Sequence, residues 1–226
     1  MQSFSMKRIQ QEPFFTWLFL AMQTVTFVLG YLLPTDPLKN AGVLYGPSVV
    51  FLGEYWRFIT PIFLHFGLMH FAVNSVVLYF MGKQIEHIYG HTRFFILYLG
   101  SGILGNLMSF AFNQPGIISA GSSTSLFGLF GAFVVLGFHF RNQPGIQAMV
   151  RQFGLFLILT FAFGAFDQSI DIWGHVGGLL GGVLFANTLA LPQNKGQYSI
   201  HIRILSGILC LFFIIFFLMY GFKKYL

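Results

Sequence analysis

The sequence predicts an all-α polytopic membrane protein, from its composition, the length of its apolar runs and the lack of alternation within them. Of its 226 residues, 56% are hydrophobic and only 8% are charged, whereas about 25% of the residues of a soluble domain are charged. Its apolar runs approach the roughly 20 residues that a helix needs to cross a bilayer. They are apolar on every side, unlike the strands of a membrane barrel, which alternate with a period of two. The lipid bilayer is therefore expected to surround most of the surface.

Seven runs are candidates for membrane-spanning helices. They are Phe14–Leu33, Phe58–Gly82, Phe94–Phe112, Ser122–Phe140, Gln152–Phe166, Ile172–Leu191 and Ile204–Phe222. The fifth run is short, so it is expected either to be tilted or to extend into the polar stretch Asp167–Asp171. The long loop before the second run contains several Pro and Gly residues and is expected to be irregular. A turn is expected at Asn113-Gln114-Pro115-Gly116, between the third and fourth runs.

The basic residues give the expected orientation, because Lys and Arg are more frequent in cytoplasmic loops. With a cytoplasmic N-terminus, 8 of the 12 basic residues lie inside and 4 lie outside. The inside set is Lys7, Arg8, Lys83, Arg93, Arg141, Arg151, Lys195 and Arg203, and the outside set is Lys39, Arg57, Lys223 and Lys224. These residues are scattered between apolar runs and form no basic patch, so we expect no nucleic-acid partner despite the net charge of +6.

Several polar residues stand where the bilayer makes them costly, which usually indicates a function. His65, His70 and Asn74 fall in the second run, the cluster Ser122–Ser125 begins the fourth, and His175 begins the sixth. All three runs cross from the outside to the inside in the expected topology. At about 1.5 Å of rise per residue, these side chains are therefore expected in one outer layer of the membrane, where they can be neighbours.

The spacing of these residues favours a site between helices. His70 and Asn74 are four residues apart and share one helix face. His175, Gly178 and Gly182 line one side of the sixth run. Small residues let two membrane helices approach closely, which is what a hydrogen bond between a Ser hydroxyl and an imidazole of another helix requires.

The chemistry of these residues predicts a Ser–His dyad. A serine hydroxyl becomes a good nucleophile when a base takes its proton, and His is suited to that role near neutral pH. Ser123 and His175 are the expected nucleophile and base. The backbone N–H of Ser123 at a helix start, together with the side chains of His70 and Asn74, can donate hydrogen bonds to an oxyanion. Phe127 lies one turn after Ser123 and is expected to stack on the imidazole of His175.

The residues leave alternatives open. The serine cluster could be only an N-cap for the fourth helix, because Ser is a favoured cap, and Ser122 is the alternative nucleophile. His65, His70 and His175 could instead hold a metal ion, but no carboxylate or Cys is near them in sequence and no H-E-x-x-H motif occurs. We therefore expect neither a metal nor a cofactor.

These motifs resemble those of the rhomboid family of intramembrane serine proteases. The segment Ser119-Ala120-Gly121-Ser122-Ser123-Thr124-Ser125-Leu126-Phe127-Gly128 is similar to the family's G-x-S active-site segment, with Thr124 where a second Gly is usual. His65-Phe66-Gly67-Leu68-Met69-His70-Phe71-Ala72-Val73-Asn74 is similar to the family's second helix, and Trp56-Arg57 to its first loop. Glu86-x-x-x-Gly90 and the Gly/His pattern of the sixth run also match.

The resemblance implies a rhomboid-like six-helix core plus a seventh, C-terminal transmembrane helix. We predict a cytoplasmic N-terminal segment over residues 1–13, the core over 14–191, and a loop and additional helix over 192–226. By resemblance, Ser123 is the nucleophile, His175 is the base, and His70 and Asn74 stabilise the oxyanion. The residues expected to support the site are Gly121, Phe127, Gly178 and Gly182.

The resemblance also implies the function. It predicts an endopeptidase in a bacterial cell membrane that cleaves transmembrane segments of other membrane proteins near the extracytoplasmic side. One alternative is a rhomboid-like protein that binds transmembrane clients without cutting them. Another is a channel or transporter, which would more often have internal repeats or paired broken helices. The substrate and the oligomeric state do not follow from the sequence.

Overall fold

The structure, a computed structural model, describes residues 12–164, 170–192 and 198–226, with residues 156–164 described by their backbone. The long helices in this part of the chain are α2 (Phe14–Leu32), α7 (His91–Phe112), α8 (Ser123–His139), α9 (Pro144–Gly164), α10 (Ile172–Leu189) and α11 (Ile200–Lys223). One further helix is continuous from α5 (Leu68–Val77) through the π-helical turn η3 (Leu78–Gly82) to α6 (Lys83–Tyr89). The prediction of an all-α fold is confirmed.

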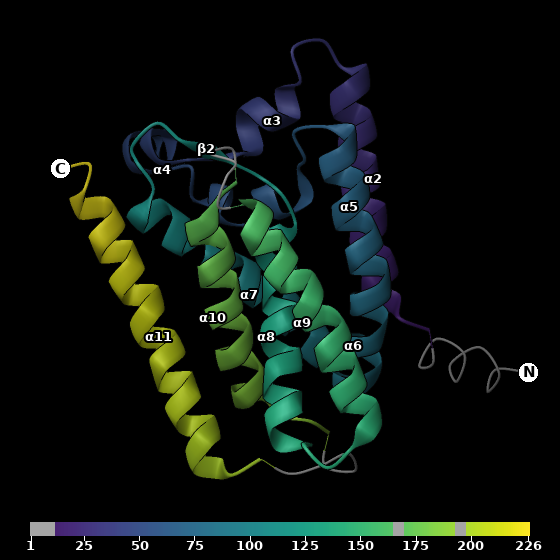
Figure 1. Cartoon of the computed structure of the whole chain (residues 1–226). Coiled ribbons are helices and arrows are strands. Elements are labelled where there is room, and N and C mark those ends of the chain that lie inside the picture. Colours follow the sequence, from purple (N-terminus) through teal and green to yellow (C-terminus); the bar gives the residue numbers. More distant parts are fainter. Residues whose placement is uncertain (1–11, 165–169, 193–197) are drawn as a thin grey trace, which may run out of the picture.

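The helices form a bundle in which α10 packs against α7 and α8 (Figure 1). The helices α2 and α5–α6 lie at one side of this group, and α11 lies at the other. By length and composition, α2, α7, α10 and α11 are apolar enough to cross a membrane, while α8 is an apolar helix of 17 residues. This arrangement agrees with the predicted polytopic membrane fold.

The second predicted span is wrong at its beginning and its end. Phe58–Gly82 was expected to be one helix, but the chain forms the short 3-10 turns η1 (Tyr55–Phe58) and η2 (Thr60–Phe63) before α5 begins at Leu68. Pro61 lacks the N–H that a helix needs, and Gly67 has extended backbone. His65 therefore lies before the helix, and the helical segment continues to Tyr89.

The first loop is more regular than predicted. It contains α3 (Pro37–Gly42), β1 (Leu44–Tyr45) and α4 (Gly46–Leu52), and β1 pairs with β2 (Ile118–Ser119) in antiparallel register. This pairing ties the first loop to the segment that leads into α8. Arg57 is buried beneath the loop and donates hydrogen bonds to the carbonyl oxygens of Val43 at 2.7 Å and Asn40 at 3.0 Å.

The fifth helix is longer than predicted. The expected run was Gln152–Phe166, but α9 begins at Pro144, a residue that favours the first position of a helix. A search for runs of apolar residues misses the first turns of α9, because these turns are polar and include Gln147 and Arg151. Gln147 donates from its amide to the carbonyl oxygen of Gly137 at 2.9 Å, which ties α9 to α8. The predicted end at Phe166, and most of the polar stretch 167–171, lie outside the described residues.

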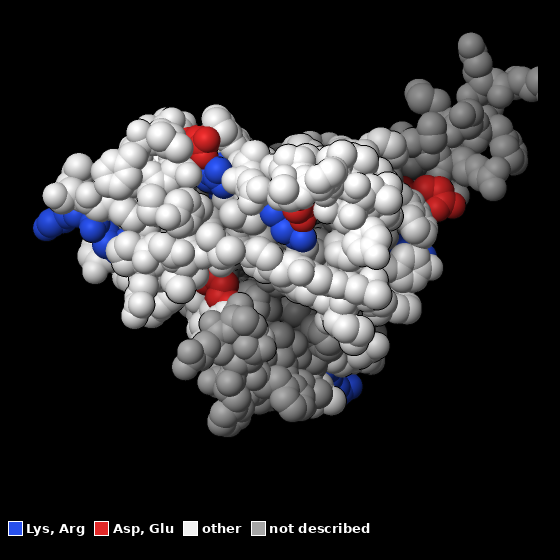
Figure 2. Space-filling view, turned by 90° about the horizontal axis from the view of Figure 1, so that it is seen from above, with Lys and Arg blue, Asp and Glu red and all other residues white. Residues whose placement is uncertain are grey.

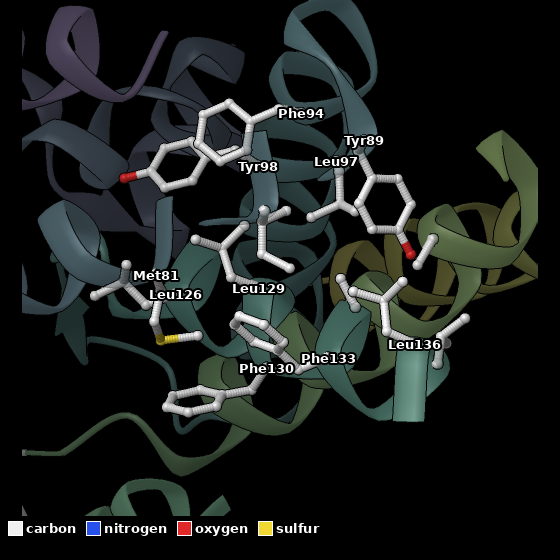
Figure 3. Close-up of a cluster of buried hydrophobic side chains, with 14 of the residues drawn as sticks. Met81, Tyr89, Phe94, Leu97, Tyr98, Leu126, Leu129, Phe130, Phe133 and Leu136 are labelled. Atoms are coloured by element: carbon white, nitrogen blue, oxygen red, sulfur yellow. The ribbon is translucent and has the colours of Figure 1, made fainter. Parts of the chain in front are cut away.

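The main hydrophobic core lies beyond the first turns of α8 and α10. Figure 3 shows side chains of α8 meeting residues of α7 and of the segment from η3 to α6. The labelled members are Met81, Tyr89, Phe94, Leu97, Tyr98, Leu126, Leu129, Phe130, Phe133 and Leu136. In the middle of α6, the buried Glu86 accepts hydrogen bonds from the backbone N–H groups of Phe15 at 2.9 Å and Thr16 at 2.8 Å. This carboxylate satisfies the start of α2 and fixes α2 to α6.

Candidate active site

The side chains of Ser123 and His175 meet at the N-terminal ends of two neighbouring helices. Ser123 is the first residue of α8, and His175 lies in the first turn of α10. The imidazole Nε2 of His175 lies 2.9 Å from the hydroxyl oxygen of Ser123. This distance is within the hydrogen-bond range expected for a nucleophile and its base.

Glycines on α10 make this short distance possible. A Cβ atom added to Gly178 would overlap the backbone of Thr124, and one added to Gly182 would overlap the backbone of Gly128. A second glycine strip, at Gly177 and Gly181, faces α7 instead. Helix α10 is therefore wedged between α7 and α8 with backbone contacts on both sides, as small residues permit in membrane helices.

Phe127 holds the ring of His175. The two rings are stacked, with centroids 4.1 Å apart and planes inclined by 11°. Both side chains are buried, and Phe127 is itself part of the main core. The stack limits rotation of the imidazole and keeps its edge directed at Ser123.

The turn before Ser123 brings His70 beside the dyad. Gly121 has φ of +138°, a conformation that L-residues with side chains rarely adopt. A Cβ at Gly121 would lie 2.8 Å from Nε2 of His70 and 3.5 Å from the hydroxyl oxygen of Ser123. The imidazole of His70 therefore flanks the turn on the same side as Ser123. Both Ser123 and His70 are half-buried, so these two side chains remain partly accessible.

Asn74 is directed at Ser122 and not at Ser123. Its amide nitrogen donates to the carbonyl oxygen of His70 at 2.7 Å, and its amide oxygen accepts from the hydroxyl of Ser122 at 3.2 Å. The assignment of oxygen and nitrogen in this amide follows from that hydrogen-bond pattern. In this arrangement Asn74 holds Ser122, in the turn before α8, against α5.

Ser122 occupies the N-cap position of α8 but makes no side-chain cap bond. Its hydroxyl instead lies 3.4 Å from Nε2 of His65, in addition to its bond to Asn74. Ser122 is fully buried, whereas Ser123 is half-buried. The shorter contact with an imidazole and the greater exposure both favour Ser123 over Ser122 as a nucleophile.

Thr124 stands where the resemblance led us to expect a glycine. Its side chain is buried and lies against Gly105 of α7 and Gly174 of α10. These two glycines leave the room that the threonine needs, so its methyl group and hydroxyl fill the junction of three helices.

Asp171 is a site residue that the sequence reasoning missed. It is the N-cap of α10, and its carboxylate accepts from the backbone N–H of Gly174 at 2.8 Å. It also accepts from Ser109 at 2.6 Å, Asn113 at 2.9 Å and Ser119 at 2.5 Å. An Asp immediately before an apolar run is a recognisable N-cap signal. The bonds to α7 and β2 join distant parts of the chain, and no local pattern reveals them.

The alternative of a metal site at His65, His70 and His175 can be compared with the described part of the chain. The rings of His65 and His70 are in contact, with centroids 5.1 Å apart. No group of three or more His, Cys, Asp or Glu side chains that could hold a metal ion occurs among residues 12–164, 170–192 and 198–226.

Comparison with known proteins identifies the family of the chain. The rhomboid domain matches residues 52–192, which is more than half of the chain. The chain belongs to the rhomboid family. The match begins at the end of α4 and covers all the site residues described above, whereas α2 and α11 lie outside it.

Named rhomboid relatives extend this finding. The chain is 36% identical to the Rhomboid protease GluP of Bacillus subtilis over 214 residues, which are 93% of this chain and 41% of that protein. It is 32% identical to the Putative rhomboid protease YdcA of the same organism, over 65% of this chain and 72% of the relative. It is 34% identical to the Rhomboid-like protease 2 of Toxoplasma gondii, over 70% of this chain and 56% of the relative. The chain thus spans about two fifths of the length of GluP.

The rhomboid domain and the apolar helices together make this chain a multi-pass integral membrane protein.

The end of the molecule that carries α3 and α4 has few charged side chains, and they are scattered (Figure 2). Two acidic and basic pairs of the first loop are Asp36 with Lys39, at 2.5 Å, and Glu54 with Arg57, at 2.6 Å.

Proposed function

We propose that this rhomboid is an intramembrane serine endopeptidase that cleaves transmembrane segments of membrane proteins near the extracytoplasmic side. Ser123 is the nucleophile and His175 is the general base. The observation that carries the proposal is the 2.9 Å separation between the imidazole Nε2 and the serine hydroxyl. The proteins named above as rhomboid proteases support the same reaction class.

The proposed reaction passes through an acyl-enzyme. The hydroxyl oxygen of Ser123 attacks the carbonyl carbon of the scissile peptide bond, while its proton moves to Nε2 of His175. For this step Nε2 must be unprotonated, so the ring proton of the neutral imidazole is on Nδ1. The C–N bond then breaks as the imidazolium returns the proton to the leaving amine. Water, deprotonated by the same imidazole, hydrolyses the ester and releases Ser123.

Three groups are candidates to stabilise the negative oxygen of the tetrahedral intermediate. The backbone N–H of Ser123 is at the start of α8, where N–H groups have no acceptor within the helix. His70 lies beside the same turn. Asn74 can join them only if its amide leaves the carbonyl oxygen of His70, to which it now donates. We therefore assign His70 and the backbone N–H the larger contributions.

The depth of the site supports cleavage near one membrane surface. Ser123 and His175 both lie in the first turn of their helices, at the end of the bundle where α3 and α4 are found (Figure 1). Deeper along α8 the side chains of Leu126, Leu129 and Phe133 are buried in the main core. With the N-terminus cytoplasmic, as the distribution of Lys and Arg predicts, this end faces the outside.

The test is labelling with a fluorophosphonate probe together with cleavage of a single-span substrate in detergent or liposomes. The wild type should be labelled and should cleave, Ser123→Ala should do neither, and Ser122→Ala should do both. Labelling that survives in Ser123→Ala and disappears in Ser122→Ala would move the nucleophile to Ser122. A folded wild type that is never labelled would instead favour the client-binding alternative.

A further inference from the structure

The carboxylate of Asp171 joins the three segments that surround the proposed dyad. It caps α10 through the N–H of Gly174, one residue before His175. It accepts from Ser109 and Asn113 at the C-terminal end of α7 and from Ser119 in β2. Ser119 lies four residues before Ser123. One side chain therefore links the helix of the base to the segment that leads to the nucleophile.

The hydrogen bonds divide evenly between the two carboxylate oxygens. Oδ1 accepts from the N–H of Gly174 and the amide of Asn113, and Oδ2 accepts from the hydroxyls of Ser109 and Ser119. The two oxygens together thus hold the start of α10 from several directions at once.

The position of His175 depends on this end of α10. The backbone N–H of His175 donates to the carbonyl oxygen of Asp171 at 3.1 Å, so a shift of Asp171 moves the turn that carries the imidazole. Gly178 and Gly182 fix the distance of α10 from α8, but smooth glycine strips do little to prevent sliding along the helix axis. The three bonds of Asp171 to Ser109, Asn113 and Ser119 supply the missing restraint along that axis.

We propose that Asp171 is a positioning residue, which keeps the imidazole of His175 in register with Ser123 by fixing the start of α10 to α7 and β2. This inference rests on the proposed function of the dyad. Asp171 itself does not touch the reacting atoms in the proposed reaction. Its removal should therefore change the rate of the chemical step and leave substrate binding nearly unaffected.

Three substitutions separate positioning from helix capping. Asp171→Ser keeps a cap for the N–H of Gly174, since Ser is a good N-cap, but it is too short to reach α7 and β2. Asp171→Asn keeps one carbonyl oxygen for Gly174 and Asn113, and its amide can donate to the hydroxyls of Ser109 and Ser119. Asp36→Ser is the matched control, because Asp36 caps α3 through the N–H of Lys39 in the first loop.

For Asp171→Ser we expect kcat to fall by about 10- to 100-fold, because misplacing a reacting group by about 1 Å can produce a loss of this size. The rate of fluorophosphonate labelling should fall with kcat, and KM should stay within about twofold of the wild-type value. Asp171→Asn should restore most of kcat, and Asp36→Ser should match the wild type. Thermal unfolding of each variant in detergent shows whether it is folded.

Four outcomes would overturn the inference. They are an unchanged kcat in Asp171→Ser, a raised KM with unchanged kcat, an equal loss in Asp36→Ser, and a loss in Asp171→Asn as large as that in Asp171→Ser. The last would assign the effect to charge and not to hydrogen bonds.

If Asp171→Ser does not fold, Ser119→Ala serves as a second variant, because it removes a single bond. Its labelling rate should still fall by about 2- to 5-fold, and an unchanged rate overturns the inference. A folded wild type that neither cleaves nor is labelled would refute the proposed function itself.

Discussion

At the scale of single residues, Ser123 and His175 are expected to behave as one functional unit. Neither side chain can carry out the proposed proton transfer without the other. Ser123→Ala and His175→Ala should each reduce cleavage to background, and the double variant should be no slower than either single one. Initial rates with a single-span substrate measure this. If the losses in the two single variants multiply in the double variant, the two residues act independently, and the dyad is refuted.

His70 and Asn74 are expected to contribute unequally. Loss of one oxyanion donor in a soluble protease costs about 10²–10³ in rate, and the backbone N–H of Ser123 would remain in each variant. His70→Ala should therefore slow cleavage by about 10- to 100-fold. Asn74→Ala should cost less, because its amide is bonded to the carbonyl oxygen of His70. Steady-state cleavage and labelling rates test this order, and unchanged rates in both variants would remove the two residues from the reaction.

The residue types of the site could be predicted from the sequence, but the contacts of several could not. Polar side chains in apolar runs are conspicuous, and for Ser123, His70 and His175 depth alone suggested that they are neighbours. The hydrogen bond that the Ser122 hydroxyl donates to Asn74 depends on a turn whose shape is set by Gly121, and it appears only in three dimensions. The sequence shows Asp171 only as the end of a polar stretch, because the hydrogen-bond partners that give it a role are 52 to 62 residues away.

At the scale of elements, the glycine strip of α10 should be intolerant of even one added carbon. A Cβ at Gly182 would overlap the carbonyl oxygen of Gly128, which belongs to backbone and cannot rotate away. We expect Gly182→Ala to displace α10 from α8, to lower stability by about 1–3 kcal/mol, and to lower the labelling rate of Ser123.

Gly207→Ala is the matched control for this prediction. Gly207 also lies within an apolar helix, α11, but the nearest atom to its added Cβ is a methyl carbon of Thr188 at an ordinary 3.5 Å. This variant should keep the melting temperature and labelling rate of the wild type. Equal effects of the two substitutions would mean that the close packing of α8 and α10 has no special role.

Element boundaries were predicted well where apolar runs end at strong signals. The first, fourth and sixth helices were predicted within two residues of their ends. The second was misplaced because residues 58–67 are as apolar as a helix but contain Pro61 and the extended Gly67. The beginning of α9 was missed for the opposite reason, since its first turns are helical but polar. Hydropathy measures burial in lipid and not helix formation, so it fails where the two differ.

At the scale of the whole molecule, the seventh helix is packed against the others. Helix α11 contacts α7 and α10, and its Cys210 and Phe217 belong to a hydrophobic cluster with Leu107 and Phe110 of α7. The predicted boundary between a core over 14–191 and a C-terminal region over 192–226 remains a proposal. Helix α11 lies outside the matched rhomboid domain, so its packing could not be inferred from the family motifs.

Lys224 attaches the C-terminal end of this helix to α7. Its ammonium group donates to the carbonyl oxygens of Phe110 at 2.5 Å, Ala111 at 3.3 Å and Asn113 at 2.6 Å. The last carbonyl groups of a helix lack N–H donors within it, and a cation there is also favoured by the helix dipole. The side chain of Asn113 in turn donates to Asp171. The C-terminal helix is thus connected to the residue that caps the helix of His175.

Lys224→Met should therefore lower stability more than activity. It keeps most of the apolar stem but leaves three carbonyl oxygens without their donor, which should cost about 1–3 kcal/mol. The neighbouring Lys223 is exposed, so Lys223→Met should change stability by no more than about 0.5 kcal/mol. Thermal unfolding in detergent, followed by tryptophan fluorescence, compares the two variants. Because Asn113 retains its side-chain bond to Asp171 in Lys224→Met, the rate of cleavage well below the melting temperature should fall only modestly. Equal melting temperatures for the two variants would mean that the ammonium group contributes no more to docking α11 than a lysine exposed to solvent does.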